Sequence, residues 1–252
     1  MVEPIFTPYL SPFIFQGERQ KESRVLSHRD RITKQLIQSA SAFARFRLQP
    51  GKTDILAYLY EGWRNRLRYT YTLDQIQNEA SIYDGYKSSV RNDIKVAQTA
   101  CIVKEEKNAK ALLSLHEASL FRKGKTSKDQ SKILEQLILS CFAKDKGFVL
   151  SIYHDDLPVC AAFVAMDDKW AYLLALGLDK KKAPRGAIQY LLHECIRRAA
   201  QKVDHFDFEG SIIKEVEPVF RAFGGKRTPV VEVSKAPKWG EILFILLNKS
   251  RW

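Results

Sequence analysis

The sequence has few cysteines and no paired cysteine motif. Four cysteines occur in 252 residues, and none shows the CxxC spacing that is typical of a structural zinc site. The sequence therefore indicates no metal centre. Three of the four lie within apolar runs, which predicts buried thiols and favours a reducing compartment. The residue outside such runs is Cys101, and the three inside them are Cys141, Cys160 and Cys195.

Long apolar runs are missing as well. No stretch reaches the roughly 18 apolar residues that a membrane-spanning helix needs. The first residues, MVEPIFTPYLSPFIFQ, are apolar, but Pro4, Pro8 and Pro12 interrupt them and no basic segment precedes them. That composition is a poor match to a signal peptide. We therefore expect a cytoplasmic protein.

Acidic residues are outnumbered by basic ones. Lys and Arg number 41 and Asp and Glu number 29, which gives a net charge of +12. This charge favours anionic partners such as nucleic acid, phosphorylated cofactors or an acidic membrane surface. A solvated basic surface would give the same total. The composition is otherwise that of a globular protein, and the length suits one large domain or two small ones.

The first half of the chain mixes helical and strand patterns. Apolar and polar residues alternate in residues 43–48 and in residues 62–73. In the second segment, Arg66 and Arg68 share a face with Thr70, and Leu67 and Tyr69 lie on the opposite face. His116 lies on the apolar face of a predicted helix, which is typical of a core histidine and also compatible with a general base. Apolar periodicity predicts helices over 28–43, 81–100, 108–122 and 128–143, and strands over 43–48 and 62–73.

The second half is denser in apolar residues. Three apolar runs separated by the short polar turns DDLP and DDK predict an antiparallel meander of buried strands. A helix with strong apolar periodicity follows, and then a strand, a short helix and another strand. The tail WGEILFILLNK fits a helix or a strand. The predicted strands cover 147–154, 158–166, 170–178, 205–211 and 228–234, and the helices cover 186–202 and 214–222.

Two groups of basic residues lie where phosphates could bind. In the predicted helix 81–100, Lys87, Arg91 and Lys95 recur one turn apart, which suits either an extended anion or a solvated helix face. The second group lies where helix 186–202 begins. A helix N-terminus offers free backbone N–H groups, and glycine lets a ligand approach closely. This group, a phosphate site or a solvated loop, consists of Lys180, Lys181, Lys182, Arg185, Gly186 and Ala187.

Two carboxylates stand in the stretch HFDFEGS, residues 205–211. On a strand, Asp207 and Glu209 would share one face. Such a pair suits a general base or a group that orients an attacking amine, and it equally suits an ion pair. Arg221 lies between Phe220 and Phe223, where it could pair with one of the carboxylates or bind a phosphate. No Ser-His-Asp or Cys-His arrangement is visible, so we predict no covalent intermediate.

These motifs resemble those of a known family. The pair FDFEGS and FRAFGG, within 206–225, and the segment RNDIKVA, 91–97, together with the order of elements, resemble the FemAB-like branch of the GNAT acyltransferases. The resemblance implies an α+β fold with a mixed, mostly antiparallel sheet flanked by helices. It also implies that residues 1–72 are a reduced N-terminal lobe and that 73–252 form the GNAT-like acyltransferase domain.

The resemblance implies an N-acyltransferase. The donor would be acyl-CoA or aminoacyl-tRNA, and the acceptor an amine of a cell-envelope precursor or a sugar. Asp207, Glu209 and Arg221 would be catalytic. The 180–187 group would bind the donor, and Lys87, Arg91 and Lys95 would bind phosphates of the substrate. An alternative is a non-catalytic module on the same scaffold that binds anions or RNA through its net positive charge.

Overall fold

The structure is a computed structural model of the chain. The chain divides into two compact units, one built from residues 1–69 with 228–252 and the other from 70–227. The assignment of 1–72 to a reduced lobe and of 73–252 to an acyltransferase domain stays a prediction. The structure describes residues 6–10, 21–39, 44–122, 128–210 and 216–235.

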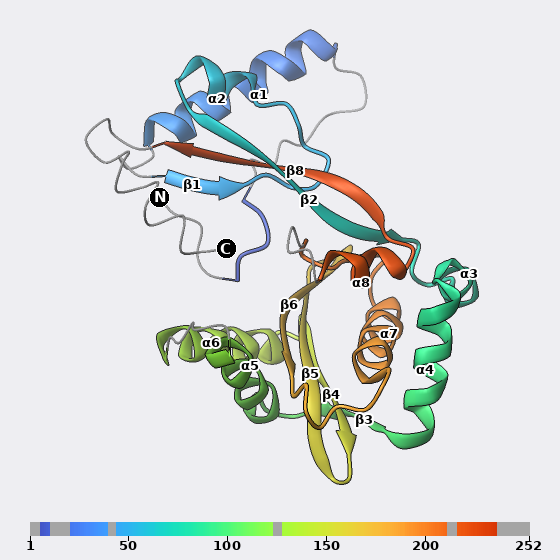
Figure 1. The fold of residues 1–252 in the computed structure, drawn as a ribbon. Helices are drawn as coiled ribbons and strands as arrows, with labels where there is room; N and C mark the ends of the chain where they lie inside the picture. Colours follow the sequence, from blue (N-terminus) through green and yellow to red (C-terminus); the bar gives the residue numbers. More distant parts are fainter. Residues whose placement is uncertain (1–5, 11–20, 40–43, 123–127, 211–215, 236–252) are drawn as a thin grey trace. The chain divides into compact units, whose positions relative to one another are not determined.

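The first unit has helices packed on one face of its strands (Figure 1). Strands β1 and β8 pair antiparallel, with Phe46 opposite Val233. The rings of Phe46, Tyr58 and Trp63 pack edge to face, with centroids 5.6 to 6.0 Å apart. The unit holds α1 (Glu22–Ser39), β1 (Ala44–Arg47), α2 (Leu56–Tyr60) and most of β2 (Arg64–Asp74) and β8 (Lys226–Lys235).

The second unit contains the predicted meander and its helices. The predicted helices at 108–122, 128–143 and 186–202 and the three strands of the meander are confirmed. Strand β3 lies between two helices and was not predicted. The unit's elements are α3 (Glu79–Gly85), α4 (Ser88–Ala100), β3 (Ile102–Glu106), α5 (Lys110–Arg122), α6 (Lys128–Ala143), β4 (Gly147–His154), β5 (Leu157–Met166), β6 (Trp170–Leu178), α7 (Ala187–Ala200), β7 (His205–Asp207) and α8 (Glu217–Ala222).

The strands follow the order β1-β8-β2-β7-β6-β5-β4-β3. Strand β7 pairs parallel to β6 and antiparallel to β2, and the meander β3-β4-β5-β6 is antiparallel throughout. Asp155 and Asp156 both have positive φ, as the tight two-residue hairpin between β4 and β5 requires. The predicted fold class, a mixed and mostly antiparallel sheet with flanking helices, is confirmed.

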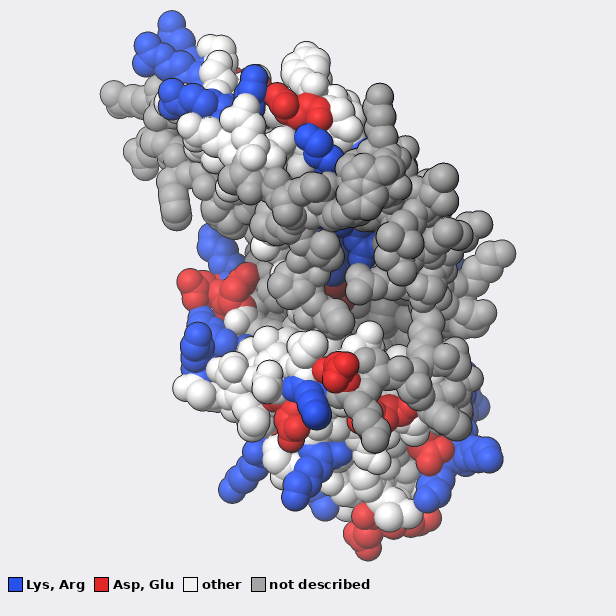
Figure 2. Space-filling view, turned by 90° about the vertical axis from the view of Figure 1, so that its left-hand side faces the viewer, with Lys and Arg blue, Asp and Glu red and all other residues white. Residues whose placement is uncertain are grey.

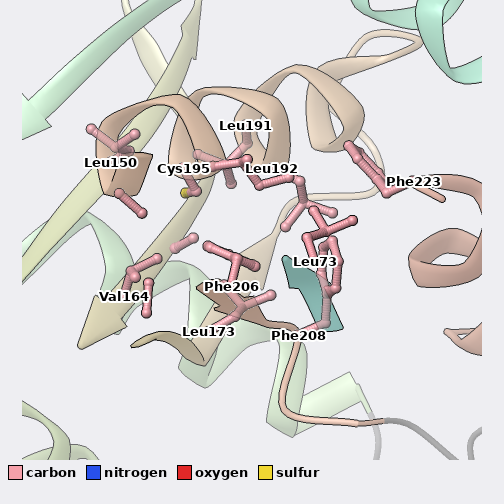
Figure 3. Packing of buried hydrophobic residues seen from close by; sticks show 14 of the residues in the cluster. Leu73, Leu150, Val164, Leu173, Leu191, Leu192, Cys195, Phe206, Phe208 and Phe223 are labelled. Atoms are coloured by element: carbon pink, nitrogen blue, oxygen red, sulfur yellow. The ribbon is translucent and has the colours of Figure 1, made fainter. Parts of the chain in front are cut away.

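Helices cover both faces of the meander. Figure 1 shows α5 and α6 on one face and α4 and α7 on the other. The inner face of α7 presents fully buried Leu191, Leu192 and Cys195 to Leu150 and Phe206 of the sheet (Figure 3). Each large apolar side chain buried in this way contributes roughly 1.5–3 kcal/mol. The apolar period of α7 read from the sequence therefore gives its packing face correctly.

Two predicted elements are shorter in the structure. The helix predicted over 81–100 is two helices, α3 and α4, because the backbone at Tyr86 and Lys87 is extended, with ψ of 146° at both residues. The strand predicted over 205–211 ends at Asp207, because Glu209 adopts a left-handed φ of +57°. The tail after residue 235 lies outside the described residues.

A half-buried histidine and two buried cysteines agree with a packed interior. His116 bonds through Nδ1 to the carbonyl of Leu176 at 3.1 Å, as a core histidine does. Cys160 and Cys195 are buried as predicted, whereas Cys141 is only half-buried. Burial raises the pKa of Cys195 well above its ordinary value.

None of the described helices combines the length and the apolar content needed to cross a membrane.

Candidate functional site

The parallel strands β6 and β7 stay together only briefly. Their pairing ends where Tyr172 lies beside Asp207, and β6 then runs on to Leu178. No described strand pairs with β6 on the β7 side over this extension. Leu174 is an extra residue against β5, which makes a bulge at the same place. Ligands commonly bind beyond the carboxyl ends of parallel strands, and bulges are common beside active sites.

Helix α7 begins after this extension of β6. Its N-cap is Gly186, with φ of +83° and no side-chain cap. A Cβ at this position would lie 1.9 Å from the backbone oxygen of Asp93 in α4, so close packing is sufficient to explain the glycine. Arg185 Nε lies 2.7 Å from Asp93 Oδ1. The backbone N–H groups of Ile188 and Gln189 have no hydrogen-bond acceptor among the described residues.

The lysine loop, residues 180–182, joins β6 to α7. Asp179 Oδ1 accepts hydrogen bonds from the N–H groups of Lys181 at 3.0 Å and Lys182 at 3.4 Å, which fixes the turn. All three lysines of the loop are exposed, whereas Ala187 is buried in the core. Free N–H groups at a helix start and nearby lysines both attract anions. This end of α7 is therefore electrostatically suited to a phosphate.

Asp207 is fully buried at the end of β7. Its Oδ1 accepts a hydrogen bond from Thr70 Oγ1 at 2.5 Å and another from the N–H of Glu209 at 2.7 Å. The second bond closes a turn of the type that aspartate favours. The prediction that Asp207 and Glu209 share a strand face is wrong, because this turn takes half-buried Glu209 out of the strand. Asp207 thus fixes the backbone that carries Glu209.

Tyr172 is the neighbour of Asp207 on the adjoining strand. Because side chains alternate and Phe206 packs under α7 (Figure 3), Asp207 lies on the opposite face of the sheet. The Tyr172 hydroxyl donates a hydrogen bond to Asp167 Oδ2 at 2.8 Å. Burial raises the pKa of Tyr172, and the Asp167 hydrogen bond and the charges of Asp207 and Glu209 raise it further. Tyr172 is therefore a protonated hydroxyl that three carboxylates influence, those of Asp167, Asp207 and Glu209.

Among the residues that the structure describes, Arg221 pairs with a carboxylate other than Asp207 and Glu209. Its Nε lies 3.3 Å from Glu217 Oε1, one turn away on α8. Glu217 also accepts hydrogen bonds from the hydroxyl of Tyr71 and from Arg227 Nη2, the latter at 3.1 Å. The Tyr71 hydrogen bond and the two arginines lower the pKa of Glu217, so it is an anion. The expected pairing of Arg221 with Asp207 or Glu209 is replaced by this pairing with Glu217.

The basic residues of α4 do not form a continuous row. Lys87 precedes the helix, and its N–H donates to the carbonyl of Ala222 at 2.9 Å. Arg91 Nη1 donates to the carbonyls of Asp84 at 2.8 Å and Tyr86 at 2.5 Å, where it closes the end of α3. Arg91 thus has a structural role that the sequence did not show. Lys87 and Lys95 are exposed.

The first unit carries five arginines on one face of its strands, here called the arginine face. Glu232 of β8 lies opposite Arg47 in register, and its carboxylate pairs with Arg68 Nη2 at 2.6 Å. Burial lowers the pKa of Arg68, the charge of Glu232 opposes this shift, and the charges of the neighbouring arginines add to it. Alternation on β1 and β2 gives the members Arg45, Arg47, Arg64, Arg66 and Arg68.

Elsewhere the charges are mixed. Figure 2 shows one face of the molecule, where described Lys and Arg side chains stand among Asp and Glu side chains. The net charge of +12 is therefore not spread evenly as one basic surface there. In the part of the chain that the structure describes, no group of three or more His, Cys, Asp or Glu is arranged to hold a metal ion.

Thr70, Tyr71, Tyr172, Glu217 and Arg227 were missed by the sequence reasoning. The partners of Thr70 and Tyr71 are 137 and 146 residues away along the chain. The only signal in the sequence was the alternation of β2, which placed Thr70 and its neighbour on opposite faces. That alternation is correct, since Tyr71 belongs to the core and Thr70 binds Asp207.

Comparisons with known proteins agree on the fold. Residues 87–212 match the family described as acetyltransferase (GNAT) domain. The fold is similar to the crystal structure of FemX, with a TM-score of 0.66 and 8% identity over 88% of this chain and 79% of FemX. It is similar to L-PGS from Bacillus licheniformis, with a TM-score of 0.57 and 12% identity over 88% of this chain and 78% of the other. No curated protein sequence matches the chain.

A third similar structure has no assigned function. It is a conserved protein from Bacteroides thetaiotaomicron, with a TM-score of 0.61 and 11% identity over 82% of this chain and 75% of that chain. At these identities the similarity is one of fold.

Proposed function

Because the chain belongs to the acetyltransferase (GNAT) domain family, matched over residues 87–212, we propose that it is an N-acyltransferase of the FemAB-like type. It would move an acyl or aminoacyl group from acyl-CoA or aminoacyl-tRNA to an amine of a cell-envelope precursor or a sugar. Family membership makes the chain a transferase, and the donor and the acceptor are part of the proposal.

The separation of β6 from β7 beside the start of α7 is the observation that carries the proposal. Acyl transfer requires a donor held in place, and both candidate donors carry phosphates. The free N–H groups of Ile188 and Gln189 and the lysine loop offer one anion site at the carboxyl end of β6. The donor's acyl group would then extend along the part of β6 that β7 leaves unpaired.

The carboxylates at the end of β7 and just after it supply the groups that the amine needs. The amine nitrogen attacks the acyl carbon, the bond from that carbon to sulfur or oxygen breaks, and one proton leaves the amine. We assign Glu209 as the base that takes this proton and Asp207 as the residue that positions it through the Glu209 N–H. The Tyr172 hydroxyl, which keeps its proton because burial raises its pKa, would supply a proton to the leaving group after exchanging its hydrogen bond to Asp167 Oδ2.

The remaining assignments complete this proposal. Arg221, held by Glu217, and exposed Lys87 and Lys95 would bind phosphates of the acceptor, and Arg91 would keep α3 and α4 in place for them. Residues 1–72 would be a reduced first lobe. The four free cysteines fit a cytoplasmic location, where thiols stay reduced.

A binding and activity panel tests the proposal. The full chain is assayed with acetyl-CoA, longer acyl-CoAs and aminoacyl-tRNA against amine acceptors, alongside a thermal-shift measurement of donor binding. We expect one donor class to bind, Glu209→Gln to lower kcat by roughly 10²-fold or more with little change in donor affinity, and alanine at Lys180, Lys181 and Lys182 to weaken binding.

A matched variant controls for lost charge. Alanine at the exposed residues Lys107, Lys132 and Lys144 removes the same three charges elsewhere in the second unit. This variant should leave donor binding unchanged. Equal weakening by both triple variants, or full activity of Glu209→Gln, would contradict the assigned site.

The arginine face favours a second candidate function, an RNA- or anion-binding module without catalysis. Five arginines on β1 and β2, the two neighbours of β8, suit a chain of phosphates. Binding of RNA should then weaken steeply as salt rises and should not need Glu209. Salt-insensitive binding that CoA displaces would argue against this candidate and for the transferase.

A further inference from the structure

The first unit contains a cavity that no step of the proposed transfer uses. It has a volume of about 280 Å³ and lies between α1, α2 and the segment that joins β1 to α2. That size is near the lower end of the roughly 300–1,000 Å³ range of small-molecule pockets. The cavity therefore suits a ligand of few atoms rather than a nucleotide or a polymer.

Two buried hydroxyls border the cavity. Thr33 of α1 is 3% exposed and Tyr58 of α2 is 4% exposed, and both line the cavity wall. Neither hydroxyl has a hydrogen-bond partner among the residues that the structure describes. Burial raises the pKa of Tyr58 to about 12, so its hydroxyl keeps its proton and can donate. Neither oxygen is among the fully enclosed side-chain atoms without a partner, so both hydroxyls are available to a polar ligand in the cavity.

The charges around the cavity balance. Arg29 and Lys52 supply two cations, and Asp30 and Asp54 supply two anions. Arg29 pairs with Asp54 across the wall, whereas Asp30 and exposed Lys52 form no ion pair with any described residue. A simple anion such as phosphate would meet the carboxylates, and a simple cation would meet Arg29 and Lys52. A ligand that carries one charge of each sign meets a complementary group at both ends.

We propose that this cavity binds a small zwitterion of the amino-acid class. The ligand's carboxylate faces Lys52, its ammonium faces Asp30, and the hydroxyls of Thr33 and Tyr58 bond its polar atoms. Leu48 and Ala57 supply the apolar part of the wall, which leaves room for a short side chain. The site lies within the first unit and does not depend on the proposed transfer reaction.

Titration of the full chain with L-alanine tests this site, read by calorimetry and by saturation-transfer NMR. Alanine amide keeps only the ammonium, and N-acetylalanine keeps only the carboxylate. We expect each to bind at least tenfold more weakly than alanine. Glucose and inorganic phosphate serve as probes of a polyol site and an anion site. Tighter binding of either one than of alanine, or no binding of alanine or of other small amino acids, overturns the proposal.

Matched variants locate the binding. Tyr58→Phe removes only the buried hydroxyl and should weaken alanine binding about three- to tenfold. Tyr60→Phe, on the same helix but 79% exposed, should change nothing. Lys52→Ala alters only an exposed side chain and should weaken alanine and N-acetylalanine but not alanine amide. Equal effects of Tyr58→Phe and Tyr60→Phe, with Lys52→Ala silent, would place the binding elsewhere.

Discussion

Replacing Gly186 by alanine should destabilise the second unit strongly. The residue has φ of +83°, where a side chain costs about 1–2 kcal/mol. Its new Cβ would lie 1.9 Å from the Asp93 oxygen, so α4 must move by about 1.5 Å to restore ordinary contact at 3.4 Å. Overpacking of this kind costs about 1–3 kcal/mol. We expect a total loss of about 2–5 kcal/mol in the free energy of unfolding.

The assay is urea unfolding, with hydrogen exchange of peptides from α7 and α2 so that the two units are followed separately. Gly62→Ala is the matched control, because Gly62 has φ of +71° and no atom within 4 Å of its Cβ position. It should cost only the backbone strain. If Gly186→Ala is no more destabilising than Gly62→Ala yet abolishes donor binding, the glycine serves a ligand and the packing argument is refuted.

Three further predictions concern ionisable groups. Burial lowers the pKa of His193 from 6.5 to about 4, and the charge of Arg197 adds to the shift. The unfolded chain therefore binds a proton at this residue more readily than the folded chain does. As the pH falls from 6.5 to 4, the free energy of unfolding should decrease by up to about 3 kcal/mol. His193→Gln should remove that part of the pH dependence in urea midpoints. Tyr71→Phe deletes the hydroxyl that donates to Glu217, so the pKa of Glu217 should rise toward its ordinary value in an NMR titration, with Tyr60→Phe as the unchanged control. Glu232→Gln leaves Arg68 among like charges and should cost about 1–3 kcal/mol, with part of the loss recovered in high salt; a loss independent of salt would contradict the electrostatic explanation.

The sequence predicted the parts of the fold whose pattern is local. The meander could be predicted because each strand is a dense apolar run and the first two runs end at paired aspartates. Asp155 and Asp156 indeed form the hairpin. The buried face of α7 could be predicted because its buried residues recur at helical spacing. In both cases neighbours in the chain are also neighbours in the structure, so periodicity was sufficient.

The break between α3 and α4 could not be predicted from periodicity. Tyr86 keeps its place on the apolar face, but its ring packs against Phe223 with centroids 4.8 Å apart. Gly224 also lies so close to the carbonyl of Gly85 that a Cβ would be 2.6 Å from it. The docking of a distant segment decides the backbone at this point. The strand end at Asp207 has a similar origin, since Thr70 from β2 binds its carboxylate.

The basic residues of the candidate site also have roles that depend on contacts distant in the sequence, which could not be predicted from local patterns. Arg91, Arg185 and Gly186 drew attention as ligands for phosphate, and all three contact backbone or carboxylate groups within the second unit. Because Asp93 of α4 meets both Arg185 and Gly186, the position of the α7 start depends on α4. Anion binding at that start would thus require α4 even if no α4 side chain touches the anion. Asp93→Asn should therefore weaken donor binding by releasing Arg185, whereas loss of a direct ligand would also change the salt dependence of binding.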